Sequence, residues 1–195
     1  MDTSLESHLQ DLYPRGREHD APLADRLLRL RNMTPAAAGL IALLIRVQGS
    51  RNVLEIGTSN GYSAIWFADA VRDTGGHLVT VEVDGERVEQ ARANIAAAGV
   101  AEHVSVVHGD GGEVLAAAAD ASADLVVLDA ERPAYVGYWP HLRRVLASRG
   151  VIAVDNAVSH RGQVEEFRKL PAADGDFAVR LIELGDGVLT AVRRR

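Results

Sequence analysis

Short apolar runs alternate with alanine-rich segments along most of the chain, beginning at Asn52 and ending near Leu170. The apolar runs are rich in Val and Ile, which favour strands, whereas the alanine-rich segments between them favour helices. Such alternation requires right-handed crossovers and therefore a parallel sheet. The expected strands are 52–57, 77–83, 103–108, 124–129 and 150–155, and the expected helices are 61–72, 85–98, 112–119, 134–147 and 161–170.

The C-terminal part of the chain departs from this alternation. Residues 177–184 and 188–192 are two further strand-like runs, and the tripeptide Gly185-Asp186-Gly187 separates them. A short glycine-containing connection between two such runs predicts an antiparallel hairpin. The predicted fold class is therefore α/β, with a Rossmann-like, doubly wound and mostly parallel seven-stranded sheet that closes with a C-terminal antiparallel hairpin.

The region before the first strand is expected to be helical. Thr34 is a good N-cap and Pro35 suits the first helical position, so a helix is predicted over 36–47, with Gly49 ending it. Residues 1–31 are polar and mixed in charge, and the spacing of their later leucines suggests a short amphipathic helix on the outside of the domain. We expect 1–31 to be a helical cap on a single domain, 1–195, that faces a partner or the substrate. The leucines concerned are Leu23, Leu27, Leu28 and Leu30.

Composition excludes several classes of protein. No apolar run approaches the roughly 20 residues of a membrane span, and the N-terminus lacks the basic start and apolar stretch of a signal peptide. We therefore expect a cytoplasmic protein with no membrane partner. The absence of cysteine excludes thiolate metal sites and leaves oxygen or imidazole ligands. The formal net charge of -6 argues against a broad nucleic-acid surface.

The first expected strand runs into a glycine turn, in the sequence VLEIGTSNGYS at residues 53–63. The spacing G-x-x-x-G lacks the glycine that lets the pyrophosphate of a dinucleotide approach the backbone. A ligand without phosphate fits this turn better. Glu55 before the first glycine and Glu82 at the end of the next strand favour a cation that bears a ribose, and S-adenosylmethionine is such a molecule. Glu82 alone also suits the ribose of a nicotinamide cofactor, so an oxidoreductase remains an alternative.

Polar residues also follow the later strands, where the carboxyl ends of a parallel sheet collect ligands. Asp129, Asp155 and Asn156 come from two strand ends that are expected to be neighbours, and they supply three oxygen ligands. Such a set suits Mg²⁺, Mn²⁺ or Ca²⁺. The alternative is that these residues only end strands or cap helices. His160 either reaches the same site at the carboxyl ends of the strands or is an exposed loop histidine.

Taken together, these motifs resemble the cation-dependent, class I S-adenosylmethionine O-methyltransferases of the catechol O-methyltransferase type, particularly the small bacterial members. The glycine turn alone is typical of class I methyltransferases in general, and its combination with the acidic and amide residues is more specific. The resemblance covers most of the chain, through residues 32–35, 53–63, 80–84, 125–130, 133–135, 154–156 and 185–188.

This resemblance implies roles for individual residues. A divalent cation held by Asp129, Asp155 and Asn156 would bind two neighbouring oxygens of a catechol-like or polyphenolic ring, so the implied partner is a small aromatic substrate. The family often dimerises, which implies a homodimer. The residues implied to contact the cofactor are Met33, Glu55, Gly57, Ser59, Gly61, Ser63, Glu82, Val83, Asp110, Gly111 and Asp129.

The sequence departs from the family pattern in two places. Many relatives carry a lysine three residues after the first metal aspartate, as the base that takes the phenol proton, but this chain has Arg132 there. Arginine stays protonated. Arg132 therefore either stabilises a phenolate that the metal has made acidic or forms a surface salt bridge with Glu131, and the catalytic candidates are Asp129 and Arg132. The stretch after Asn156, which helps to form the acceptor pocket in the family, is shorter than in many bacterial relatives.

Two further alternatives remain open. Methylation of a hydroxylated tRNA base is possible for a similar fold, but the acidic total and the lack of a basic stripe disfavour it. The loss of the lysine also permits a member that binds the cofactor with little catalytic activity.

Overall fold

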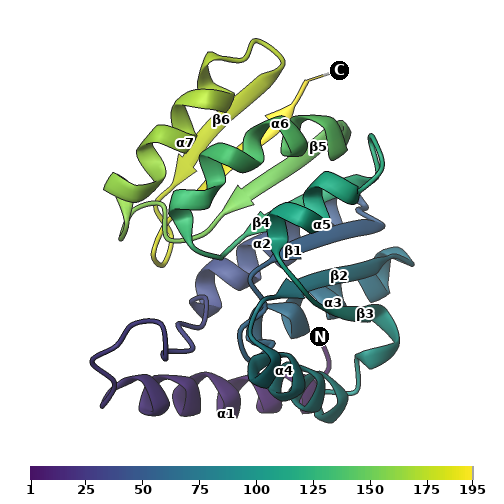
Figure 1. The fold of residues 1–195 in the computed structure, drawn as a ribbon. Helices are drawn as coiled ribbons and strands as arrows, with labels where there is room; N and C mark the ends of the chain where they lie inside the picture. The colour runs from purple at the N-terminus through teal and green to yellow at the C-terminus, as the bar shows by residue number, and fades with distance from the viewer. Residues whose placement is uncertain (195) are drawn as a thin grey trace.

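The computed structural model describes residues 1–194, and Arg195, the last residue of the predicted domain, lies outside the described residues. A seven-stranded sheet forms the centre of the molecule, with helices on both of its faces (Figure 1). The strand order is β3-β2-β1-β4-β5-β7-β6. The first five strands pair in parallel and β7 pairs antiparallel with β5 and β6, which confirms the predicted fold class.

The boundaries follow the expected alternation closely. The predicted helix over 134–147 extends two residues too far, because the chain enters the fifth strand at Leu146, earlier than expected. The strands are β1 (Asn52–Ile56), β2 (His77–Glu82), β3 (Val104–His108), β4 (Ala123–Leu128), β5 (Leu146–Val154), β6 (Phe177–Ile182) and β7 (Val188–Arg193). The helices are α1 (Thr3–Asp20), α2 (Pro35–Gln48), α3 (Tyr62–Thr74), α4 (Gly85–Ala97), α5 (Gly111–Ala117), α6 (Tyr135–Val145) and α7 (Arg161–Ala173), with 3-10 turns η1 (Ala101–His103) and η2 (Arg132–Ala134).

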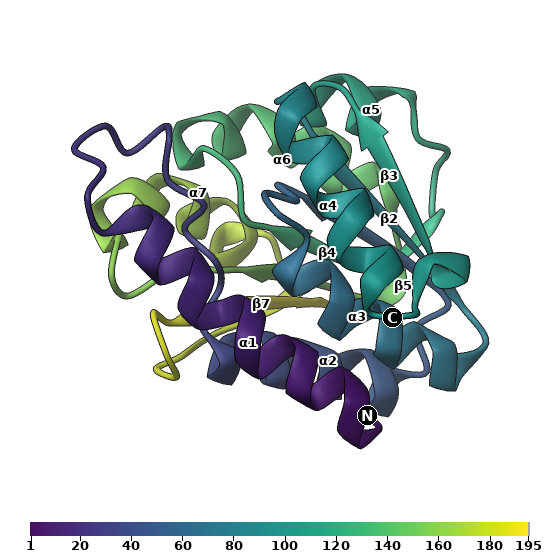
Figure 2. The ribbon, with the colours of Figure 1, turned by 90° about the horizontal axis from the view of Figure 1, so that it is seen from below.

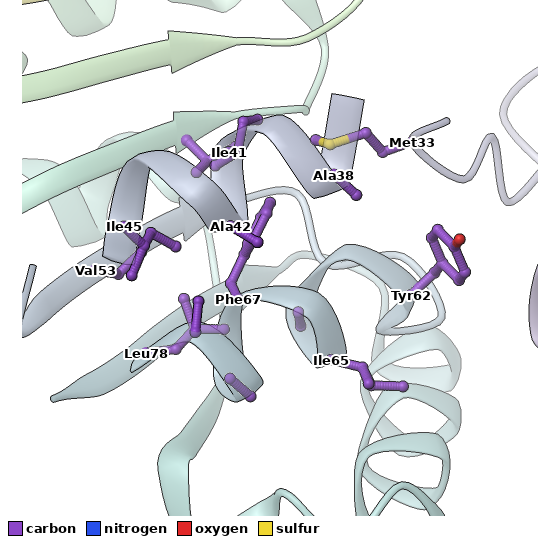
Figure 3. Close-up of a cluster of buried hydrophobic side chains, with 14 of the residues drawn as sticks. Met33, Ala38, Ile41, Ala42, Ile45, Val53, Tyr62, Ile65, Phe67 and Leu78 are labelled. Atoms are coloured by element: carbon purple, nitrogen blue, oxygen red, sulfur yellow. The ribbon is translucent and has the colours of Figure 1, made fainter. Parts of the chain in front are cut away.

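The central strands are buried on both faces, and successive side chains enter two different cores. On β4, Leu125 and Val127 join a cluster formed with α1, α2, α3 and α4, whereas Val126 and Leu128 join a cluster formed with α5, α6 and α7. Figure 3 shows part of the first cluster, where Phe67 of α3 lies among side chains of α2 and the sheet. Two-sided burial explains why these strands are continuous apolar runs.

The N-terminal region differs from its prediction. The first helix is α1, which packs Leu5, Leu9 and Leu12 into the core and runs beside α2 and α3 (Figure 2). The amphipathic helix predicted around Leu23 to Leu30 is wrong, since residues 21–34 form turns and irregular backbone. After this segment, Thr34 caps α2 through a hydrogen bond from the backbone N–H of Ala37, as predicted. No helix within residues 1–194 has the length and apolar character that a membrane span needs.

The glycine turn after β1 brings two strand ends unusually close together. Gly57 has a φ of 102°, and a Cβ atom at this position would lie 2.4 Å from the backbone oxygen of Asp129. The backbone N–H of Asp129 donates to the carbonyl of Ile56 at 2.9 Å, which ties the end of β4 to the end of β1. Only glycine satisfies both the positive φ and this approach.

Replacing Gly57 by alanine is therefore expected to destabilise the protein more than the same change at Gly49. Gly49 also has a positive φ, of 71°, but no atom lies within 4 Å of a Cβ built there. We expect Gly49→Ala to cost about 1 kcal/mol for the left-handed backbone, and Gly57→Ala to cost a further ~1–3 kcal/mol for the overlap. Urea unfolding of both variants measures the difference, and equal losses would contradict the close approach.

Candidate active site

A cavity of about 820 Å³ opens at the carboxyl ends of β1, β2 and β4. The strand order reverses between β1 and β4, and open α/β sheets bind their ligands at such a reversal. The irregular segment 26–32 closes one side of the cavity. Most of the predicted site residues line it, namely Gly57, Ser59, Glu82, Val83, Asp110, Gly111, Asp129, Arg132 and Asn156.

The remaining predicted residues do not line the cavity; they are Met33, Glu55, Gly61, Ser63 and the buried Asp155. The Met33 side chain is buried in the core formed with α1, α2, α3 and α4. Gly61 faces the backbone of Ala91, which lies 3.2 Å from the position of a Cβ at residue 61. Glu55 and Ser63 are buried beneath the glycine turn. Their contacts with a cofactor stay predictions.

Glu82 presents a fixed carboxylate to the cavity. Its Oε2 accepts a hydrogen bond from the backbone N–H of Ser59 at 2.8 Å, and its Oε1 accepts from those of Val83 and Asp84 at 3.0 and 3.1 Å. A carboxylate has about four acceptor sites. The three backbone donors therefore orient Glu82 and leave it room for one hydroxyl of a ligand.

Glu55 has a different environment, although the sequence suggested a similar role for it. Its two oxygens accept hydrogen bonds from the hydroxyls of Ser63 and Thr80, both at 2.6 Å, and it is fully buried. Burial raises the pKa of Glu55 to about 7, an effect that these two hydrogen bonds oppose and the nearby charge of Glu82 reinforces. Glu55 thus supports the glycine turn from below.

Asp129, Asp155 and Asn156 meet at the end of β4 and β5, as the sequence predicted. The parallel pair Leu128 and Val154 brings the two aspartates level, and the Nδ2 of Asn156 donates to Asp129 Oδ1 at 3.2 Å and Asp155 Oδ2 at 3.0 Å. Burial raises the pKa values of both aspartates, and the charge of Asp155 raises that of Asp129 further. Within residues 1–194, no group of three His, Asp or Glu side chains is arranged to hold a metal ion.

Arg132 points into the molecule, so of the two alternatives for this residue the surface salt bridge with Glu131 is wrong. The side chain is 4% exposed, and its Nε donates to Gln163 Oε1 at 2.7 Å. Glu131 instead pairs with Arg26 at 2.8 Å and with Arg31 at 3.0 Å. Arg132 therefore remains a cavity residue with a neutral partner.

The arginines of the segment 26–32 also line the cavity, and no sequence motif pointed to them. Asp20 holds this segment, because its carboxylate accepts hydrogen bonds from the backbone N–H groups of Leu30 at 2.7 Å and Arg31 at 2.8 Å. The hydroxyl of Ser59 donates to the carbonyl of Leu30 at 2.8 Å and joins the segment to the glycine turn. The helical spacing of the leucines concealed this role, and the density of arginine was the available signal.

Side chains from the C-terminal half of the chain complete the wall. His160 is an exposed residue between β5 and α7 and also lines the cavity, so both descriptions weighed from the sequence apply. Its pKa is lowered, first by partial burial and then by the charge of Arg132. Asp186, in the turn between β6 and β7, also lines the cavity, as does Tyr138 of α6.

Comparison with known proteins identifies the family. Residues 24–194 match the family model described as O-methyltransferase. A Mycobacterium tuberculosis protein named as a probable O-methyltransferase is 36% identical in an alignment of length 174 that covers 83% of this chain and 77% of that protein. The chain belongs to the O-methyltransferase family. This membership confirms the family resemblance and excludes the oxidoreductase alternative.

Solved structures of O-methyltransferases share the whole fold. The O-methyltransferase of Bacillus cereus superposes with a TM-score of 0.79 and 26% identity, covering 100% of this chain and 92% of that one. The O-methyltransferase TomG of Streptomyces achromogenes superposes with a TM-score of 0.76 and 29% identity, covering 100% and 91%. In this O-methyltransferase, the cavity lies at the carboxyl ends of the parallel strands, where the strand order reverses between β1 and β4.

The raised pKa of Glu55 predicts a specific dependence of stability on pH. Because the folded pKa of about 7 exceeds the ordinary glutamate value of 4.5, the contribution of Glu55 to stability is greatest below pH 4.5 and is lost as the pH rises through 7. Glu55→Gln removes the ionisation and keeps the size of the side chain. We expect the free energy of unfolding of the variant, relative to the wild type, to improve by about 2 kcal/mol between pH 5 and pH 8. Urea unfolding at both pH values checks this, and a difference that does not change with pH would contradict it.

Proposed function

We propose that this O-methyltransferase transfers a methyl group from S-adenosylmethionine to a hydroxyl of a small catechol-like aromatic, with the help of a divalent cation. One observation carries the proposal: a single cavity is lined by Glu82 and also by Asp129 and Asn156, and the buried Asp155 lies directly behind Asn156. The Bacillus cereus structure is described as a complex with SAH and the Streptomyces achromogenes structure as a complex with SAM, which supports the choice of cofactor.

Glu82 and the glycine turn would hold the cofactor. Glu82, oriented by three backbone N–H groups, is placed to accept a ribose hydroxyl. Gly111 begins α5 beside β1, and a Cβ there would lie 2.3 Å from the Ile56 side chain, so only glycine lets this backbone come so close. We assign the adenine to the part of the cavity formed by Asp110, Gly111 and Tyr138.

The cluster at β4 and β5 fits a divalent cation. Two carboxylates and an amide are the hard oxygen donors that Mg²⁺ prefers, and Mn²⁺ or Ca²⁺ meets the same ligands. Asp155 Oδ1 is buried and has no hydrogen-bond partner within residues 1–194, so an acceptor is left for a cation. Turning the Asn156 amide about its last bond brings its oxygen to the two carboxylates. When bound, the cation would act as a Lewis acid that makes a coordinated hydroxyl more acidic.

Arg132 would stabilise the acceptor oxygen as a phenolate. Its guanidinium is permanently charged, lines the cavity and, within residues 1–194, makes only the Nε bond to Gln163. The terminal nitrogens therefore remain available to an anion in the cavity. A positive charge in a site with little water stabilises developing negative charge strongly, and the cavity holds the oxygen close to the sulfonium methyl group.

Removing divalent metal is expected to abolish methyl transfer. We expect a chelator to stop turnover of catechol, because the charges of Asp129 and Asp155 would then be left without a cation, and added Mg²⁺ to restore it. Methyl transfer is measured with S-adenosylmethionine, and calorimetry with the same cofactor serves as the control for a folded protein. Turnover that is indifferent to the chelator would remove the cation from the mechanism. Cofactor binding without turnover of any polyphenol would favour the cofactor-binding role.

Substitutions at Arg132 separate its charge from the missing base. Arg132→Met removes the charge, so we expect kcat to fall about tenfold or more. Arg132→Lys keeps a cation that is able to lose its proton, so we expect kcat to rise severalfold at pH 8. Steady-state kinetics with catechol and saturating Mg²⁺ compare the variants. An unchanged rate in Arg132→Lys would show that acidification by the metal suffices.

A further inference from the structure

We propose that the acceptor ring carries an anionic substituent of the carboxylate class, which Arg26 and Arg31 bind at the mouth of the cavity. The inference rests on the proposed function, because it concerns the substrate of the same site. Five arginines line this cavity, more than a neutral catechol requires, and their present partners show which of them are available. They are Arg26, Arg29, Arg31, Arg87 and Arg132.

Two of the five arginines form hydrogen bonds to backbone carbonyls of the neighbouring segment. Arg29 donates from Nε and Nη2 to the carbonyl of Leu23, at 2.8 and 2.5 Å. Arg87 reaches across from α4 and donates to the carbonyls of Leu27 and Arg29. Their hydrogen bonds stabilise the segment 26–32, and a substrate is not needed to explain them.

Arg26 and Arg31 share a single carboxylate, and so they keep an excess of positive charge. Arg26 Nη2 and Arg31 Nη2 lie 2.8 and 3.0 Å from the two oxygens of Glu131, whose side chain is 41% exposed. Arg31 Nε is buried and has no hydrogen-bond partner within residues 1–194. One carboxylate cannot neutralise two guanidinium groups, so a second anion can bind beside Glu131.

The backbone at Arg31 is held in an unusual conformation. Its φ is 51°, in the left-handed region that residues with a Cβ rarely adopt. The Asp20 carboxylate stabilises this conformation by accepting from the backbone N–H groups of Leu30 and Arg31. A strained residue that its surroundings hold in place is characteristic of a ligand site.

The charges around the acceptor end support an anion rather than a cation. Asp129, Glu131 and Asp186 line the cavity, and Asp155 is buried beside Asn156. The proposed divalent cation would offset Asp129 and Asp155, and Glu131 is already shared by two arginines. Arg132, whose hydrogen-bond partner Gln163 is neutral, adds a further positive charge. With the metal in place, the acceptor end is therefore net positive, which favours an anionic substrate over a neutral one.

Matched acceptors test the proposal. 3,4-Dihydroxybenzoate and 3,4-dihydroxybenzamide differ mainly in the charge of the substituent, and catechol lacks the substituent. With S-adenosylmethionine and Mg²⁺, we expect kcat/KM to be about tenfold higher for the acid than for the amide. Equal values for acid and amide would overturn this inference alone, whereas turnover of none of the three would overturn the proposed function as well.

Variants show whether the arginines cause the preference. We expect Arg26→Gln and Arg31→Gln to lower the ratio of acid to amide severalfold, and Glu131→Gln to raise it, because it frees both guanidinium groups. Arg92→Gln, at an exposed residue of α4 that pairs with Glu89 and does not line the cavity, is the matched control and should leave the ratio unchanged. Both rates in a ratio are measured on one preparation, so differences in folded fraction cancel. The difference in ring electronics between acid and amide is the same for every variant, so it cancels when the ratios of two variants are compared.

The acid-to-amide ratio is expected to fall in the two arginine variants and to rise in Glu131→Gln. These opposite changes distinguish binding of the substituent from mere support of the segment 26–32. If Glu131 and its two arginines only fastened residues 26–32, all three substitutions would lower activity on every acceptor and leave the ratio of acid to amide unchanged. That result, or a ratio that falls in Glu131→Gln, would overturn the proposal.

Discussion

The parallel pairing of β1 with β4 is the contact on which the rest of the site depends. The two strands lie where the order of the sheet reverses, so the connections that follow them leave toward opposite faces and a cavity opens between them. Gly57 lets the two strand ends touch, because any larger residue would overlap the backbone of Asp129. The glycine turn and the acidic cluster, far apart in the sequence, therefore become two walls of one cavity.

Buried carboxylates in this protein fall into two groups that differ in their hydrogen bonding. Both oxygens of Glu55 accept hydrogen bonds from hydroxyls, so each has a partner within the fold. Asp155 is equally inaccessible, but one of its oxygens has no partner within residues 1–194. A buried acceptor without a partner destabilises a fold. Such a group is best explained by a ligand that offsets its cost, which is why Asp155 supports a cation and Glu55 does not.

The sequence predicted those parts of the structure that follow from strand periodicity. Asp129 and Asp155 could be placed together because adjacent parallel strands end at the same edge of the sheet. The segment 21–34 could not be predicted in this way. Its leucines have helical spacing, but the Asp20 carboxylate binds the backbone N–H groups of Leu30 and Arg31 and stabilises an irregular conformation instead. The orientation of the Arg132 side chain could not be predicted from the sequence either, because it depends on a hydrogen bond to Gln163 of α7.

Arginine at position 132 changes how the acceptor end of the cavity can work. A lysine must lose its proton, and its charge with it, before it can act as a base, so a lysine ready to act as a base does not attract an anion. Arg132 keeps its charge throughout, as Arg26 and Arg31 do. In the proposed reaction, acidity must then come from the cation, while the arginines attract an anionic acceptor and stabilise its phenolate at every pH where the protein is folded. Recognition and stabilisation would thus draw on the same permanent charges, so an anionic acceptor suits this variant of the site better than a neutral one.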